Sequence, residues 1–149
     1  MSKDPLEDSR GSFCNTYYMI IAGIDYSLRG PAVCVFNNIM GDTFFTFKHC
    51  KFYFLTDTKK YSTTFLNNIH GSMFEEYNHE CERYDTISSW AVDVCFGCEQ
   101  VGLEGYAYGA KGRVFHIPEN TGILKYKLFQ HSIPVEVMSP SEKIGRAHV

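Results

Sequence analysis

The most constraining feature of the sequence is a short apolar run near its start that ends in a single carboxylate. Residues 18–26 read YMIIAGIDY, and the lack of alternation between apolar and polar positions predicts a strand buried on both faces. Asp25 closes this run. A turn marked by Gly30 and Pro31 follows, and a second strand is predicted from Ala32 to Phe36. The chain is therefore expected to fold around a central strand that carries an acid at its end.

The rest of the sequence predicts three further strands and two helices. In chain order these are a strand from Phe44 to Leu55, a helix from Asp85 to Phe96, a strand ending at Glu104, a helix from Asn120 or Thr121 to Gln130, and a strand from Val135 to Met138. Strands 1–3 are expected to form an antiparallel meander, and strands 4 and 5 to lie parallel to the first. The predicted fold class is α/β, with a mixed five-stranded sheet and flanking helices.

The clearest helix follows the spacing of one helical face. Apolar residues from Ile87 to Cys95 recur at i, i+3, i+4, i+7 and i+8. Asp85 is the predicted N-cap and Gly97 the predicted stop. Because this spacing already places Cys95 in the core, the CFGC motif ending at Cys98 favours buried thiols over a zinc site, which would need a second cysteine pair.

The composition is that of one globular domain. The 149 residues include 44% hydrophobic residues, and the formal net charge is −3. This balance argues mildly against a nucleic-acid binder, although a nuclease can combine catalytic carboxylates with a local basic patch. No apolar run is long enough to span a membrane, and the N-terminus does not resemble a signal peptide. An intracellular protein with reduced cysteines is expected.

The two ends of the sequence differ from its middle. Residues 1–18 are polar without periodicity and are interpreted as a flexible or non-native extension. The last six residues, IGRAHV (144–149), resemble the in-frame translation of a sequencing adapter and are interpreted as a scar. The domain is therefore expected to span residues 19–143 and to be incomplete at its C-terminus.

Asp25 and Glu104 form the candidate site. If the first and fourth strands are parallel neighbours, both acids emerge at the same edge of the sheet, where sites in such sheets are found. Adjacent carboxylates repel unless a proton or cation lies between them, and their oxygens suit Mg²⁺ or Mn²⁺. Gly23 and Gly105 would leave the backbone beside the acids open to a ligand.

Four segments resemble the phage-type RuvC-like Holliday junction resolvases, which have a ribonuclease H-like fold. They read GIDYSLRGPAVCVF, ERYDTISSWA, LEGYAYGAKGRVFHIPENTGILKYKL and IPVEVMSPSEK, and they span roughly residues 19–143. The first segment alone is also similar to the phosphate loop of sugar kinases and actin-like proteins, but those need a second, duplicated domain. The third segment and the order and spacing of all four favour the resolvases.

The resemblance implies a reaction and a ligand set. Asp25 and Glu104 match the catalytic, metal-binding acids of the first and fourth strands, and two Mg²⁺ or Mn²⁺ ions would support hydrolysis of DNA phosphodiesters at a four-way junction. It also implies a homodimer, a phage-encoded protein in the bacterial cytoplasm, and further acids on a last helix. That helix is missing from this sequence, so the chain is expected to have little or no activity.

Further predictions concern DNA contacts, solvent-facing lysines and core aromatic residues. Four are expected to contact DNA, namely Ser27, Arg29, Lys111 and Arg113. Lys125 and Lys127 are expected to lie on a solvated helix face, and the aromatic residues of the third strand to pack in the core. Two alternative functions stay open: a ribonuclease H-fold nuclease acting on other branched or hybrid substrates, and a non-catalytic junction-binding protein.

Overall fold

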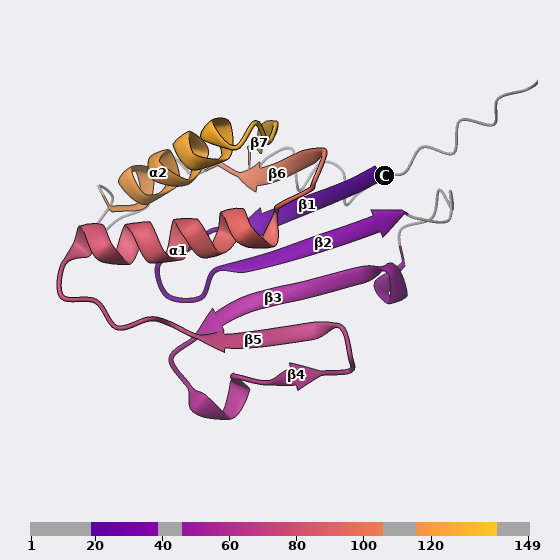
Figure 1. Cartoon of the computed structure of the whole chain (residues 1–149), viewed down its shortest axis with the longest axis horizontal. Coiled ribbons are helices and arrows are strands. Elements are labelled where there is room, and N and C mark those ends of the chain that lie inside the picture. The colour runs from indigo at the N-terminus through magenta and orange to yellow at the C-terminus, as the bar shows by residue number, and fades with distance from the viewer. Residues whose placement is uncertain (1–18, 39–45, 106–115, 140–149) are drawn as a thin grey trace, which may run out of the picture.

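The computed structural model describes residues 19–38, 46–105 and 116–139 of the chain. These contain seven strands, two α-helices and two short 3-10 helices (Figure 1). In chain order they are β1 (Met19–Asp25), β2 (Ala32–Asn38), η1 (Phe47–His49), β3 (Cys50–Thr56), η2 (Lys59–Tyr61), β4 (Thr64–Phe65), β5 (Ile69–Met73), α1 (Glu80–Val94), β6 (Gln100–Glu104), α2 (His116–Gln130) and β7 (Val135–Met138). Lys111, Arg113 and the two chain ends lie outside the described residues.

The seven strands form one mixed sheet in the order β4-β5-β3-β2-β1-β6-β7. The predicted meander is confirmed, because β2 pairs antiparallel with both β1 and β3. The predicted crossovers are confirmed as well, because β6 lies parallel beside β1 and β7 lies parallel beside β6. Since β5 is parallel to β3, five strands run in one direction and end at the same edge of the sheet, here called the carboxyl edge (Figure 1).

The prediction of five strands is wrong, because β4 and β5 extend the sheet beyond β3. The turn between them places Leu66 and Asn67 at positive φ, 49° and 64°. Glycine is the usual residue for such backbone angles, so its absence here hides the hairpin in the sequence. Asn68 holds the turn against the start of β3, because its Nδ2 donates to the backbone oxygens of Phe47 and Cys50 at 3.2 and 3.1 Å.

The third strand begins at Cys50 rather than at the predicted Phe44. The residues just before it form η1, which is closed by a hydrogen bond of 3.0 Å from the His49 amide to the Thr46 carbonyl. Phe44 itself lies outside the described residues. The aromatic run is therefore divided between a helical turn and a strand.

The aromatic residues of β3 were predicted to pack in the core, and this prediction is wrong. Leu55 is the core residue of β3, whereas Phe52 and Tyr53 are half-buried. The rings stack in pairs instead. Phe47 lies on Phe52 with ring centroids 5.4 Å apart, and Tyr53 lies on His70 at 5.1 Å. Position explains this result, since α1 packs against α2 and β2 and leaves most of β3 outside the helical layer.

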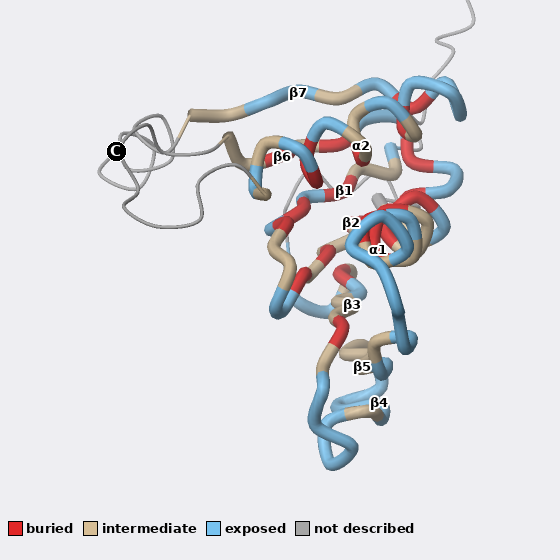
Figure 2. The backbone as a smooth tube through the Cα atoms, turned by 90° about the vertical axis from the view of Figure 1, so that its left-hand side faces the viewer, coloured by how far each residue is buried: buried red, intermediate tan, exposed pale blue. Residues whose placement is uncertain are grey.

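Both α-helices pack on the same face of the sheet, which Figure 2 shows nearly edge on. The core lies between this face and the helices, and its most buried members include Ile87, Ala91, Val101, Leu103, Leu124 and Leu128. The predicted flanking helices are thus present on one face. Across β1, β2, β6 and β7, the other face is covered by no helix of the described residues.

Helix α1 begins more than one turn before the predicted N-cap, Asp85. The N-cap is His79, whose Nδ1 accepts a hydrogen bond of 3.1 Å from the Cys81 amide. Glu82 reaches back so that its Oε2 accepts from the Asn78 amide at 2.8 Å. This exchange is close to a capping box, with histidine in the position that serine or threonine usually takes.

Lys127 was predicted to lie on a solvated helix face, but its amino group contacts α1. Its Nζ donates to the backbone oxygen of Asp85 at 2.9 Å and to Ser89 Oγ at 2.8 Å, and it forms an ion pair with the Asp85 carboxylate. Lys125 is also only partly exposed. These contacts join α2 to α1, so Lys127 serves helix packing rather than solvation.

Helix α2 begins at His116, before the predicted start at Asn120 or Thr121. Pro118 lies in the first turn, where a missing amide hydrogen costs no helical bond. A hydrogen bond of 2.8 Å between Tyr84 OH and His116 Nδ1 fixes this turn to α1. Asn120 and Thr121 are therefore buried residues inside the helix.

Helix α1 ends at Val94, two residues before the predicted Phe96, and the predicted burial of its cysteines and the role of Gly97 are confirmed. Cys95 and Cys98 are buried members of the core, and Gly97 adopts the positive φ of 84° expected after a helix end. Neither of the described helices has the length and apolar character required of a membrane span.

Candidate active site

The carboxyl edge brings Asp25 and Glu104 side by side. Ile24 of β1 is in register with Leu103 of β6, and each acid is the next residue of its strand. Ile24 and Leu103 are 4% and 0% exposed and belong to the core. Because side chains alternate along a strand, Asp25 and Glu104 project from the opposite, helix-free face. The structure thus contains the juxtaposition predicted from the strand order.

Both acids open onto one hollow of about 270 Å³. Cys34 of β2 lines one side of it, and Met138 and Ser139 at the end of β7 line the other. Asp25 is exposed and Glu104 is half-buried, so ions and phosphate oxygens can approach from solvent. The hollow can therefore admit a ligand that touches both carboxylates at once.

Next to the carboxylates, the sheet surface carries no side chains where two glycines lie side by side on neighbouring strands. Gly23 and Gly102 are a register pair on β1 and β6, and each lies two residues before an acid, on the same face. A Cβ added at Gly23 would have no atom within 4 Å. At Gly102 the nearest atom would be Met138 Cε, at 3.1 Å. We call this strip over Gly23 and Gly102 the glycine trough.

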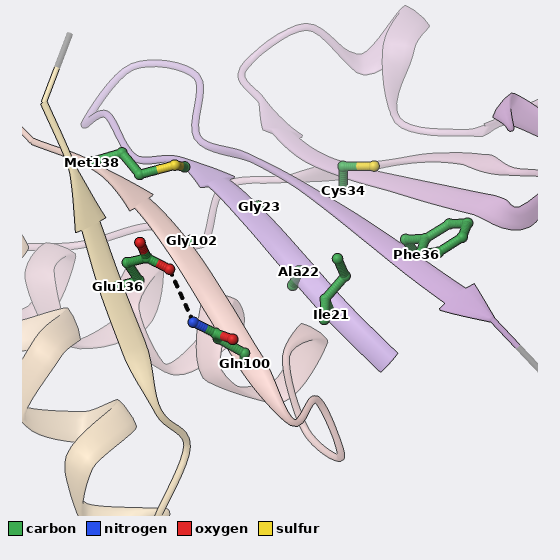
Figure 3. Close-up of a pocket in the computed structure, with 9 residues that line it drawn as sticks. All are labelled: Ile21, Ala22, Gly23, Cys34, Phe36, Gln100, Gly102, Glu136 and Met138. Carbon is green, nitrogen blue, oxygen red and sulfur yellow. Dashed lines mark hydrogen bonds between the residues drawn. The ribbon is translucent and has the colours of Figure 1, made fainter. Parts of the chain in front are cut away.

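Gly23 and Gly102 also line a second hollow of about 370 Å³ (Figure 3). Because the same glycines line the hollow of the carboxylates, the glycine trough joins the two. Ile21 and Cys34 line the second hollow on one side. On the other side Gln100 Nε2 donates to Glu136 Oε2 at 3.0 Å, which joins β6 to β7. The helix-free face is thus a continuous, largely apolar depression that leads to Asp25 and Glu104.

Gly105 has a different role from the one predicted. Its amide donates to the Met138 carbonyl at 2.7 Å, and an added Cβ would lie 3.2 Å from that oxygen and 3.3 Å from Val137 Cγ1. The missing side chain therefore lets β7 approach β6, rather than admitting a ligand. Sequence reasoning did not single out Gly102. The sequence does contain a signal for Gly102, because it lies two residues before Glu104, just as Gly23 lies two residues before Asp25.

The turn after β1 carries two residues that were predicted to contact DNA. Ser27 Oγ accepts a hydrogen bond of 3.0 Å from the Gly30 amide, so this side chain closes the turn. Arg29 is exposed at the tip of the turn. Arg29 is thus the more exposed of the two, while the Ser27 hydroxyl keeps its own hydrogen free to donate.

Arg29 shares a hollow of about 460 Å³ with a second arginine, Arg83 of α1. Arg83 is held in place, because its Nη2 donates to the Leu28 carbonyl at 2.5 Å and its guanidinium lies 5.1 Å from the centre of the Tyr77 ring. Asp57, which follows β3, lines the same hollow and offsets part of the positive charge. Sequence reasoning missed Arg83 although it lies in the segment ERYDTISSWA.

Tyr26 ties the end of β1 to the helical layer. It follows Asp25, is 9% exposed, and donates from its hydroxyl to Asn120 Oδ1 of α2 at 3.0 Å. Burial raises the pKa of Tyr26 well above its usual range, although hydrogen bonds with Ser88 and Asn120 act in the opposite direction. Because this bond fixes the residue beside Asp25, it also fixes the backbone that carries the carboxylate.

Tyr26 is expected to make stability sensitive to alkaline pH. Its pKa is about 10 in the unfolded chain and higher in the folded protein, so its contribution is complete below pH 10 and decreases as pH rises further. Tyr26→Phe should cost about 1–3 kcal/mol at pH 8, because Asn120 loses its donor. This cost should shrink by roughly 1.4 kcal/mol between pH 8 and pH 11. Urea unfolding at each pH measures it.

A matched control for this experiment is Tyr126→Phe, since Tyr126 is 61% exposed on α2, the helix that carries Asn120. It should leave the free energy of unfolding unchanged at both pH values. A Tyr26→Phe cost that stays constant from pH 8 to pH 11 would contradict the assigned pKa shift.

The donor set suits a hard divalent cation. Asp25 and Glu104 offer carboxylate oxygens only, they lie adjacent, and they face a solvent-accessible hollow. Within the described ranges, no group of three or more histidine, cysteine, aspartate or glutamate side chains is placed to hold a metal ion. The described part of the site thus fits an Mg²⁺-type ion that keeps several ligand positions for water or phosphate.

Comparison with known proteins identifies the fold. No protein family and no curated protein matches the sequence. RuvC of T. thermophilus in complex with a Holliday junction substrate aligns with a TM-score of 0.53 at 15% identity, over 83% of this chain and 66% of that chain. A second structure, Thermus thermophilus RuvC, aligns with a TM-score of 0.50 at 16% identity, over 82% and 64%. The chain has the ribonuclease H-like fold of RuvC. It spans about two thirds of the length of those structures.

Proposed function

We propose that this chain is the ribonuclease H-like part of a metal-dependent endonuclease that cuts branched DNA, with the four-way junction as its substrate. The observation that carries the proposal is the register of β1 and β6, which sets Asp25 and Glu104 side by side at an open edge. The shared fold adds support, because one RuvC structure was solved with a Holliday junction substrate. The phage-type resolvases are the group that the four sequence segments favour.

Asp25 and Glu104 would hold Mg²⁺ or Mn²⁺, with two ions in a complete site. Such ions supply a Lewis acid that stabilises charge on the phosphoryl oxygens during hydrolysis. The carboxylates themselves repel when alone, so their proximity favours a bound cation. The glycine trough would let the DNA backbone come close to both acids, and the apolar floor of the trough would limit access of bulk water.

The flanking polar residues would position the DNA. Arg29 and Arg83 lie at the same edge as the carboxylates and are suited to phosphate contacts, and Ser27 would keep Arg29 in place through the turn. Lys111 and Arg113 are proposed phosphate contacts on the segment that follows β6. A homodimer would match the two-fold symmetry of a junction, and a phage-encoded protein would work in the bacterial cytoplasm.

A second candidate function is junction binding without cleavage. It is favoured by the small number of ligands, since the described residues provide two carboxylates and no third aspartate, glutamate, histidine or cysteine grouped with them. The resemblance implies that further acids are needed for full activity. We therefore expect cleavage by Asp25 and Glu104 alone to be slow or absent, whereas binding needs only the fold and the cationic side chains.

A substrate panel tests these proposals. Binding and cleavage should be measured on four-way, three-way and linear DNA duplexes and on an RNA–DNA hybrid, with and without Mg²⁺ or Mn²⁺. The resolvase proposal predicts at least tenfold tighter binding to the four-way junction than to linear duplex, on the order of 1.4 kcal/mol. Cleavage confined to the hybrid would favour the other nuclease class. Equal binding to all four would overturn the junction assignment.

A further inference from the structure

A hollow of about 680 Å³ lies at the edge of the sheet opposite the carboxylates. Ile20 near the start of β1 and Asn37 near the end of β2 lie along one side of it. The remaining walls come from η1, from the first half of β3, from the turn between β4 and β5, and from the end of α1. We call it the far hollow. Five strand steps, about 17 Å along β1, separate Ile20 from Asp25, and the far hollow lies on the side of the sheet that carries α1.

The far hollow is lined by basic side chains. Lys48 and Lys51 are exposed along its rim, and His49 lies between them in sequence. Neither lysine forms an ion pair with a described residue, and the described lining contains no aspartate or glutamate. This local charge is opposite in sign to the chain as a whole, whose net charge is −3. A polyanion is the ligand that such a rim attracts.

Exposed aromatic rings accompany the lysines. Phe96, just after α1, is 78% exposed, and Phe47 is 53% exposed, and both line the far hollow. Phe47 is held by its stacking on Phe52, so its ring is presented in a fixed orientation. Aromatic rings next to cationic side chains are the usual means of binding unpaired bases, since every base has a face that can stack.

Two amide oxygens in the same lining have unused hydrogen-bonding capacity. Asn37 Oδ1 and Asn68 Oδ1 are buried and accept no hydrogen bond from a described residue. Asn68 cannot simply turn, because its Nδ2 already donates to two backbone oxygens. Buried acceptors of this kind are costly unless a donor reaches them. Both oxygens are closed to solvent, so the case for a ligand rests on the exposed lysines and rings and not on these acceptors.

We propose that the far hollow binds an unpaired DNA strand, with phosphates at Lys48 and Lys51 and a base stacked on Phe96 or Phe47. The inference rests on the proposed function for the choice of DNA as the polymer. A protein partner fits less well, because lysine is depleted in protein–protein interfaces. The far hollow would hold one unpaired strand while another is presented at the carboxyl edge.

The test uses the 149-residue chain, a fluorescent 20-nucleotide single strand, and no divalent metal. Lys48→Gln with Lys51→Gln should weaken binding roughly tenfold at 0.1 M salt and reduce the salt slope by about 1.4, the value for two phosphates on a single strand. Phe96→Leu should weaken binding roughly fivefold or more without changing that slope. The matched control is Lys59→Gln with Lys60→Gln on η2, which removes the same charge outside the far hollow.

The outcomes separate this inference from the proposed function. Loss of single-strand binding in the Lys48/Lys51 variant, with the Lys59/Lys60 control unchanged, supports the far hollow even if the chain shows no preference for junctions. Equal losses in both double variants would show charge attraction without a site and would overturn the inference. So would a chain that does not bind the single strand, or a Phe96→Leu variant that binds it as tightly as the wild-type chain.

Discussion

Asp25→Asn is expected to abolish divalent metal binding at the carboxyl edge and to leave the fold intact. Asp25 is exposed at the end of β1 and makes no core contact, so the substitution removes a charge without opening a cavity. Changes in groups that merely support a metal ligand cost 10–100-fold in affinity. Loss of a ligand itself should therefore cost at least about 100-fold in Mn²⁺ affinity.

Thermal unfolding gives a readout that does not depend on activity. At a Mn²⁺ concentration 100 times its dissociation constant, binding should stabilise the wild-type chain by about 2.7 kcal/mol. Asp25→Asn and Glu104→Gln should each lose this stabilisation, while Asp93→Asn, on the exposed side of α1, should keep it. Any form of the protein that cleaves junctions should stop cleaving with Asp25→Asn and still bind them. Full Mn²⁺ stabilisation in both site variants would refute the metal assignment.

Leu128→Ala is expected to have the largest effect on stability. Leu128 lies on α2, is 0% exposed, and packs in the core between the two helices and the sheet. Truncating a leucine at such a position removes apolar burial and leaves a cavity, which costs about 2–5 kcal/mol. The total free energy of unfolding of a domain is roughly 5–15 kcal/mol, so the variant should unfold at a much lower urea concentration.

The neighbouring residue provides the control. Phe129 follows Leu128 in the same helix but is 76% exposed. Phe129→Ala removes a larger side chain, yet it should change the free energy of unfolding by less than about 0.5 kcal/mol, as surface substitutions usually do. Similar losses for the two variants would mean that α2 does not pack on the sheet as described.

The strand order could be predicted because it follows from local signals. The unbroken apolar run of β1 predicts a central strand, and the structure gives it neighbours on both sides. The register of Ile24 with Leu103 then follows from placing the two acid-ending strands in parallel. This is why the pairing of Asp25 with Glu104 was accessible from the sequence, even though the two residues are distant in the chain.

The parts that could not be predicted depend on contacts between distant segments. The β4–β5 hairpin uses Leu66 and Asn67 at positive φ, so it lacks the glycine that normally reveals such a turn. The true N-cap of α1 is His79, a residue that rarely has this role. The open surface beside the acids depends on Gly102, whose role becomes evident only once β6 is placed next to β1. Tertiary pairing, rather than local propensity, gives these residues their roles.

The position of β6 has a consequence for the order in which the strands pair during synthesis. Strands β1, β2 and β3 are consecutive and can pair as soon as they leave the ribosome, whereas β6 follows β1 by about eighty residues. Until β6 arrives, β1 is an unprotected apolar edge open to pairing with other chains. Contacts between such distant segments form slowly. The two carboxylates therefore meet only after β6 has joined β1, so the proposed metal site cannot form before that step.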